Sequence, residues 1–167
     1  MRLRYTLLCL LAVLWTSSSQ AQITRFGEDV NAAIESGLSW LDGRGVFANP
    51  SPAGNGAGLV ALALLEKPES ADQRAVATGY ANASPADQGK IELIMTDVIN
   101  RANGGFYAYR NGSSMMALVV YLRTGGPQQA AARQALDRSF DQVIANQNNA
   151  GYWCYSNGSC NDSSTTQ

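Results

Sequence analysis

The chain has 167 residues, about the length of one domain, and its 12 basic and 13 acidic residues leave it nearly neutral, which argues against a nucleic-acid partner. It contains no histidine. Within this segment that excludes the Ser-His-Asp and Cys-His catalytic arrangements and the histidine-containing zinc sites.

The first 21 residues have the three parts of a secretory signal peptide: the basic Arg2 and Arg4, an apolar run over residues 5–15, and a small-residue cleavage site that ends at Ala21. A membrane anchor is the alternative, but the apolar run is shorter than the roughly 20 residues that cross a bilayer. We therefore expect an exported chain that begins at Gln22 and carries no transmembrane segment. It would lie in the periplasm, the cell envelope or the extracellular space. Without Arg2 and Arg4 its net charge is −3.

An amphipathic helix and an apolar helix are predicted next. Apolar residues recur at helical spacing from Phe26 to Leu41, and Gly43 follows them. A glycine-rich loop then leads to an unbroken apolar run over residues 58–65, which ends before Pro68. Residues 69–83 are polar, and we expect a loop or a short helix there.

The same order recurs in the second copy. Ser84 is a predicted N-cap, followed by Pro85 at the first helical position, Asp87 and an amphipathic helix that ends before Gly104. A glycine-aromatic loop and Ser113 come next, and then an apolar helix over residues 115–122. Because a helix that is apolar all round needs protein on every side, we expect this helix and the one over residues 58–65 to be enclosed.

A third copy begins with a helix whose predicted apolar face holds Leu136, Phe140, Val143 and Ile144. A second glycine-aromatic loop follows at residues 150–155, and Asp162 and Ser163 are the predicted cap of a further inner helix. The alternation predicts an all-α fold of helical-hairpin repeats, with amphipathic helices outside and apolar helices inside. An ordinary bundle of four or five helices is the alternative.

The last of these loops, Gly151-Tyr152-Trp153-Cys154-Tyr155, followed by Asp162-Ser163-Ser164-Thr165-Thr166-Gln167, resembles a motif of the terpenoid cyclase and protein prenyltransferase superfamily. The segment Gly105-Phe106-Tyr107-Ala108-Tyr109 is similar to a degraded copy of it. The resemblance, to the prenyltransferase and squalene oxidase repeat, implies a partial α/α-toroid over residues 22–167.

The resemblance does not identify a reaction that this chain could catalyse. The D-x-D-D acid cluster of the family's cyclases is absent, and the zinc ligands of its prenyltransferases include a histidine that this chain lacks. We expect no catalytic, cofactor-binding or metal-binding residue in this segment. A closed toroid needs more than the two and a half hairpins found here, so we expect the domain to continue beyond Gln167, or another chain to cover its inner helices.

Three groups of residues are candidates for a specific role. Cys154 and Cys160 lie in a short polar loop of an exported chain, where a disulfide is favoured over metal ligation. Asparagines at four N-x-S sequons, Asn82, Asn111, Asn157 and Asn161, are glycosylation candidates if the secretory route is eukaryotic. The aromatic side chains of the two loops either pack against neighbouring hairpins or contact a ligand; they are Phe106, Tyr107, Tyr109, Tyr152, Trp153 and Tyr155.

These observations favour a non-catalytic binding or structural scaffold of a cell-envelope or extracellular protein. Its partner could be a carbohydrate, a lipid or a protein. The alternative is the N-terminal part of a secreted toroid enzyme, cyclase-like, isomerase-like or active on a polysaccharide, whose catalytic acids lie outside this segment.

Overall fold

The computed structural model describes residues 23–156, and in this range the chain is helical. It forms α2 (Arg25–Gly43), the short 3-10 helix η1 (Ser51–Gly56), α3 (Ala57–Leu65), α4 (Pro85–Arg101), α5 (Ala108–Arg123) and α6 (Gln129–Ala145). The expected all-α class is confirmed. Within this range the polar segment 69–83 holds turns and no helix, and isolated bridges join Ile23 to Asp72 and Pro68 to Ala77.

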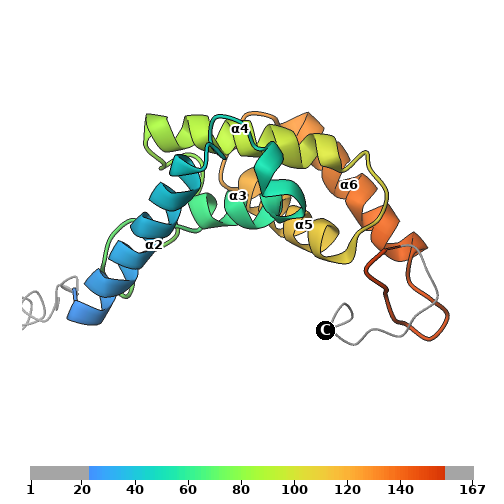
Figure 1. Cartoon of the computed structure of the whole chain (residues 1–167), viewed down its shortest axis with the longest axis horizontal. Coiled ribbons are helices and arrows are strands. Elements are labelled where there is room, and N and C mark those ends of the chain that lie inside the picture. The colour runs from blue at the N-terminus through green and yellow to red at the C-terminus, as the bar shows by residue number, and fades with distance from the viewer. Residues whose placement is uncertain (1–22, 157–167) are drawn as a thin grey trace, which may run out of the picture.

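The helices form an open arch (Figure 1). Helices α3 and α5 pack side by side in the middle, α4 packs on α3 along the top of the arch, and α6 packs along α5. Helix α2 slopes away at the other end and touches α3 far more lightly. No helix in the described range is both long enough and apolar enough to span a membrane.

The core lies where α4 meets α3 and α5. Four side chains of α4 are fully buried there, at the spacing of one helix face: Ile91, Ile94, Met95 and Val98. Helices α3 and α5 approach closely because Gly58 has no side chain. A β-carbon at Gly58 would lie 2.5 Å from the carbonyl carbon of Ser113.

The start of α4 matches the prediction from its local sequence. Ser84 is the N-cap, and its hydroxyl oxygen accepts a hydrogen bond of 3.1 Å from the backbone N–H of Asp87. Pro85 takes the first helical position, and Asp87 lies in the first turn, where its negative charge suits the helix dipole. All of these groups lie within four residues of one another, so the helix start can be predicted from the local sequence.

The start of α5 differs from the prediction. The helix begins at Ala108 with Tyr107 as its N-cap, so the last two residues of the expected aromatic loop are helical and Ser113 lies inside the helix. The Ser113 hydroxyl donates to the Tyr109 carbonyl oxygen at 2.8 Å. The first turn is closed by Asn111, whose Oδ1 accepts a hydrogen bond of 3.1 Å from the backbone N–H of Tyr107.

The predicted core face of α6 is only partly correct: Leu136 packs against the core, but Phe140 is 52% exposed and Ile144 is exposed as well. The buried residues of this helix are the small Ala132, Ala135 and Ser139. Small side chains let α6 lie close against α5, and the larger apolar residues remain on its flank.

The predicted apolar face of α2 is only partly buried, and Leu38 is the one buried residue of this helix.

Ion pairs connect α2 to the rest of the molecule. Lys67 Nζ lies 2.6 Å from a carboxylate oxygen of Glu35 in α2 and 3.7 Å from one of Asp87 in α4, and Lys90 lies 3.3 Å from one of Asp42.

Candidate functional site: the inner face and the tyrosine cluster

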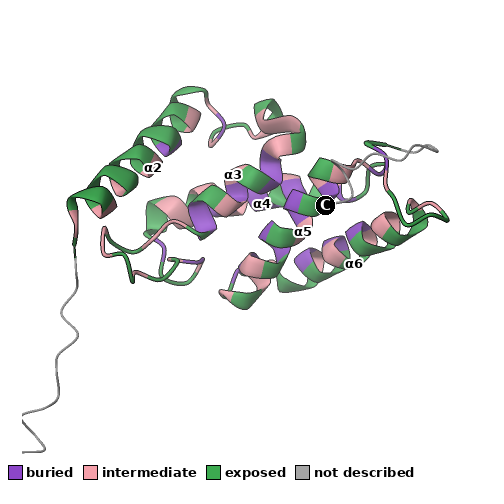
Figure 2. Ribbon diagram, turned by 90° about the horizontal axis from the view of Figure 1, so that it is seen from below, coloured by how far each residue is buried: buried purple, intermediate pink, exposed green. Residues whose placement is uncertain are grey.

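Helices α3 and α5 each carry exposed apolar residues on the side opposite their buried residues. We call this surface the inner face and define it by Leu59 and Ala63 of α3 and Met116 and Val119 of α5, all of them exposed. Leu59 is 63% and Met116 61% exposed. Figure 2, which views the molecule from below, shows α3 and α5 in the centre with α2 and α6 on either side.

Within residues 23–156 the two apolar helices are enclosed on one side only, so the rest of the cover that their sequences predict is not supplied by this range. One side of each helix is buried, at Ala61 and Leu65 of α3 and at Leu118 and Tyr121 of α5. The other side is uncovered within residues 23–156, although large apolar side chains are usually shielded from water. An apolar surface that spans two helices is the kind of surface that binds a partner.

A groove of about 320 Å³ extends the inner face toward α2. Its walls come from α2, from α3 and from Glu66 and Lys67, the two residues that follow α3; Lys67 is paired with the carboxylates of Glu35 and Asp87. The lining residues are Ile34, Gly37, Leu38, Leu41, Leu62, Ala63, Glu66 and Lys67. Because Ala63 belongs to both surfaces, the groove and the inner face are continuous.

Three tyrosines from the two glycine-aromatic loops meet at the N-terminal end of α5. The ring of Tyr109 stands 6.2 Å from that of Tyr107 and 5.4 Å from that of Tyr155, both edge to face, and the rings of Tyr107 and Tyr155 are 6.5 Å apart. The backbone N–H of Ala108 donates to the Tyr155 carbonyl oxygen at 2.9 Å and joins the loops. We call these three residues the tyrosine cluster. Tyr109 and Tyr155 are exposed, so they can also contact a ligand.

The other aromatic candidates are divided between packing and exposure. Phe106 is buried, and the Trp153 indole N–H donates to the Val143 carbonyl oxygen at 2.7 Å, which fixes the loop to the end of α6. Tyr152 is exposed. Phe106 and Trp153 therefore have packing roles, and the surface available to a ligand is formed by the exposed tyrosines.

The buried amide of Asn111 and its partner Gln142 position the tyrosine cluster, and no sequence pattern predicted their contact. Asn111 is only 2% exposed, and its Nδ2 donates to Gln142 Oε1 of α6 at 2.7 Å. Gln142 Nε2 in turn donates to the carbonyl oxygens of Ala102 and Gly104, at 3.1 and 2.8 Å. Asn111 is therefore unsuited to glycosylation, because its amide nitrogen is buried and bonded. Asn82 is exposed, and the sequons at Asn157 and Asn161 lie outside the described residues.

A second polar group lies where α4, α5 and α6 meet. Gln128 Nε2 donates to Glu92 Oε2 at 3.1 Å, its backbone N–H donates to the Tyr121 hydroxyl at 3.3 Å, and the rings of Tyr121 and Tyr80 are edge to face. Hydrogen bonding to Glu92, and then burial, raise the pKa of Tyr80 to about 12. Burial raises the pKa of Tyr121 as well. Both hydroxyls hold their protons at neutral pH, which suits packing and not proton abstraction.

The remaining candidates lie near or beyond the end of the described range. Cys154 is buried and disulfide-bonded. Cys160, Asp162 and Ser163 fall outside the described residues, so the pairing of Cys154 with Cys160 and the inner-helix cap stay predictions. Within residues 23–156 no three histidine, cysteine, aspartate or glutamate side chains gather closely enough to hold a metal ion.

The arrangement as a whole could bind a partner, because it combines an apolar surface, an adjoining groove and the tyrosine cluster at one end. Comparison with known proteins adds no relative, since no family model, curated protein or solved structure matches the chain.

Proposed function

We propose that the chain is an exported, non-catalytic helical-repeat domain of the α/α-toroid type, a scaffold that binds an apolar partner on its inner face. Export is proposed from the signal-peptide pattern of residues 1–21. The single observation that carries the binding role is the exposure of Leu59 and Met116 on two helices that pack against each other.

The order of the helices supports the repeat arrangement. The apolar α3 and α5 are neighbours in the middle, and each is followed in the chain by an amphipathic helix that packs on it, α4 on α3 and α6 on α5. This is the relation that neighbouring hairpins have in a two-layered helical repeat. In a toroid the inner face would line the central space.

The chemistry of the inner face supports an apolar partner. Helix α3 carries no charged residue, and α5 carries charge only near its two ends, at Arg110 and Arg123. Burying exposed leucine and methionine side chains is favourable by about 25 cal/mol per Å² of apolar area. The exposed tyrosines at one end have both a ring and a hydroxyl, and so can contact a partner with polar groups at its edge.

Binding of an apolar fluorescent probe, 1-anilinonaphthalene-8-sulfonate, tests the proposal. We expect the purified protein to bind the probe and the double substitution Leu59→Gln with Met116→Gln to reduce its fluorescence severalfold. The matched control is Val76→Gln in the loop after α3, where the wild-type side chain is as exposed as that of Leu59. Thermal unfolding shows whether each variant is folded.

Two results would overturn the proposal. One is the absence of probe binding by a folded protein. The other is equal loss of binding in the double variant and in the Val76→Gln control, since this would mean that the probe does not select the inner face.

A further inference from the structure

Helix α2 carries a second apolar stripe, which its contacts with α3 leave free. Its residues follow one another at spacings of four, three, four and three, the pattern by which one helix packs along another. All five are exposed, with Phe26 70% and Trp40 60% exposed at its two ends. We call this stripe the α2 seam; it consists of Phe26, Val30, Ala33, Gly37 and Trp40.

The seam differs from the face by which α2 joins the rest of the molecule. Leu38 is buried and Ile34 and Leu41 are partly buried in that joint, a different sector of the helix. The other two amphipathic helices each have an apolar helix against them, α4 on α3 and α6 on α5. Along the α2 seam no such helix is present within residues 23–156.

The seam is complementary to itself when two copies run antiparallel. Its large residues, Phe26 and Trp40, lie seven residues on either side of Ala33. Centred there, two antiparallel helices place Phe26 of one opposite Trp40 of the other, and Val30 within one residue, about 1.5 Å along the axis, of Gly37. The small Ala33 and Gly37 let the helices approach closely, and a β-carbon at Gly37 would meet nothing within 4 Å in the single chain.

The charges of α2 permit this pairing. Glu28, Glu35 and Asp42 lie on the opposite side of the helix from the seam, and Glu35 and Asp42 are already paired with lysines of the body. Asp29 borders the seam, and the antiparallel arrangement brings it near Ser36 of the other helix. Antiparallel helix dipoles are also favourable side by side.

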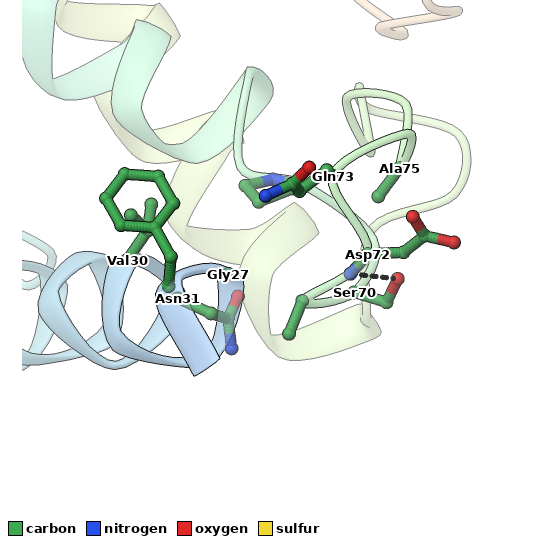
Figure 3. Close-up of a pocket in the computed structure, with 10 residues that line it drawn as sticks. Gly27, Val30, Asn31, Ser70, Asp72, Gln73 and Ala75 are labelled. Carbon is green, nitrogen blue, oxygen red and sulfur yellow. Dashed lines mark hydrogen bonds between the residues drawn. The ribbon is translucent and has the colours of Figure 1, made fainter. Parts of the chain in front are cut away.

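A hollow at the N-terminal end of the seam offers room for the tryptophan of a second copy. It measures about 290 Å³ and lies between Phe26 and Val30 of α2 and the loop over residues 70–75. Figure 3 shows Val30 and Asn31 on the helix facing Gln73 and Ala75 across this hollow, with the Asp72 backbone N–H bonded to the Ser70 hydroxyl. An aromatic side chain inserted in a pocket is the usual anchor of a protein interface.

We infer that the chain forms a twofold-symmetric dimer through the α2 seam, with the two α2 helices antiparallel and Trp40 of each copy in the hollow beside Phe26 of the other. A single helix pair is smaller than a standard interface, so the dimer forms and dissociates with concentration. The four residues of the inner face stay free in the dimer for the partner of the proposed function, and the dimer covers only Gly37 at the edge of the adjoining groove.

Disulfide cross-linking tests the register. Val30→Cys and Gly37→Cys proteins, mixed under mild oxidation, are expected to cross-link to each other more than to themselves. The matched control is Glu28→Cys mixed with Ser39→Cys, which lie at the same relative height in this register but on the opposite side of the helix, and this mixture is expected to dimerise without cross-linking. Equal cross-linking of both mixtures, or of neither, would overturn the inference.

Sedimentation equilibrium tests the dimer without new cysteines. The weight-average mass of the wild-type protein is expected to rise toward twice the chain mass with concentration, and Phe26→Glu is expected to hold it at the monomer value. Ala32→Glu is the control and is expected to dimerise. A wild-type protein that is monomeric throughout contradicts the inference. So does a dimer that survives Phe26→Glu but is lost in Met116→Glu, because it would be formed by the inner face.

Discussion

At the scale of single residues, the packing of α3 against α5 depends on the glycine at position 58. A β-carbon there would lie 2.5 to 2.7 Å from three backbone atoms of Ser113 and Ser114. Such backbone atoms belong to a helix and cannot move without displacing it. Gly112, one residue before Ser113, has nothing within 4 Å of its β position.

We expect Gly58→Ala to lower the free energy of unfolding by about 1–3 kcal/mol, the usual cost of overpacking. Gly112→Ala, in the middle of α5, is expected to raise it by about 0.5–1 kcal/mol through helix propensity. Urea unfolding of both variants measures the difference. A Gly58→Ala protein as stable as Gly112→Ala would contradict the close approach of α3 and α5.

The raised pKa of Tyr80 makes stability depend on alkaline pH. An unfolded tyrosine loses its proton near pH 10, whereas the folded protein keeps the Tyr80 proton up to about pH 12. Above pH 10 the unfolded state therefore binds fewer protons than the folded state, and the free energy of unfolding falls between pH 10 and 12.

Tyr80→Phe is expected to make that fall shallower, as measured by urea midpoints at intervals from pH 8 to 11.5. Part of the slope remains in the variant, because the pKa values of Tyr121 and Lys67 are raised as well. A slope that is unchanged by Tyr80→Phe would contradict the contact with Glu92.

Residue roles were predictable from the sequence where the partner is local. Ser84 caps the backbone three residues away, and its role follows from its neighbours. Asn111 looked like an exposed sequon, because the Gln142 side chain that holds it is 31 residues distant. The tyrosine cluster was foreseen as a list of candidate aromatics, but not as a contact between loops, since the register of Ala108 against Tyr155 is set by tertiary packing.

At the scale of elements, α2 is the most weakly attached helix. Lys67 links Glu35 of α2 to Asp87 of α4, and the other charged link is between Lys90 and Asp42. These pairs are partly exposed, so each contributes little to global stability, on the order of 0.2–1 kcal/mol. Their effect is expected in the local opening of α2 and not in the unfolding of the whole chain.

Lys67→Met is expected to speed hydrogen exchange of the α2 amides severalfold and to leave α4 unchanged. Arg101→Met is the control, because the Arg101 pair with Asp97 lies within α4. Hydrogen exchange followed by mass spectrometry resolves the two helices. Unchanged α2 exchange in Lys67→Met would show that apolar contacts alone hold the helix.

Helix positions were better predicted than helix faces. Periodicity and caps placed α2, α3 and α4 closely, since both are properties of the local chain. The start of α5 was missed because Asn111 caps it from inside the helix. Periodicity found only the second half of α6, and its predicted face was partly wrong, because the close approach of α5 buries Ala132 and Ala135 and leaves the larger Phe140 outside.

At the scale of the whole molecule, the fold leaves the apolar inner face uncovered within residues 23–156. The small number of hairpins predicted that the apolar helices would need cover from outside this segment, and α3 and α5 pack as neighbours with Leu59 and Met116 exposed. Which residues of each helix stay exposed was not predictable, because this depends on which elements meet in space. The proposed scaffold role depends on this exposure more than on any other feature.

Methionine oxidation measures that exposure directly. Met116 lies on the inner face and Met95 is fully buried in α4, so the two side chains are an internal comparison. With dilute hydrogen peroxide and peptide mass spectrometry, we expect Met116 to be oxidised much faster than Met95, and to be protected when an apolar partner binds. Oxidation of Met116 as slow as that of Met95 in the protein alone would contradict an open inner face.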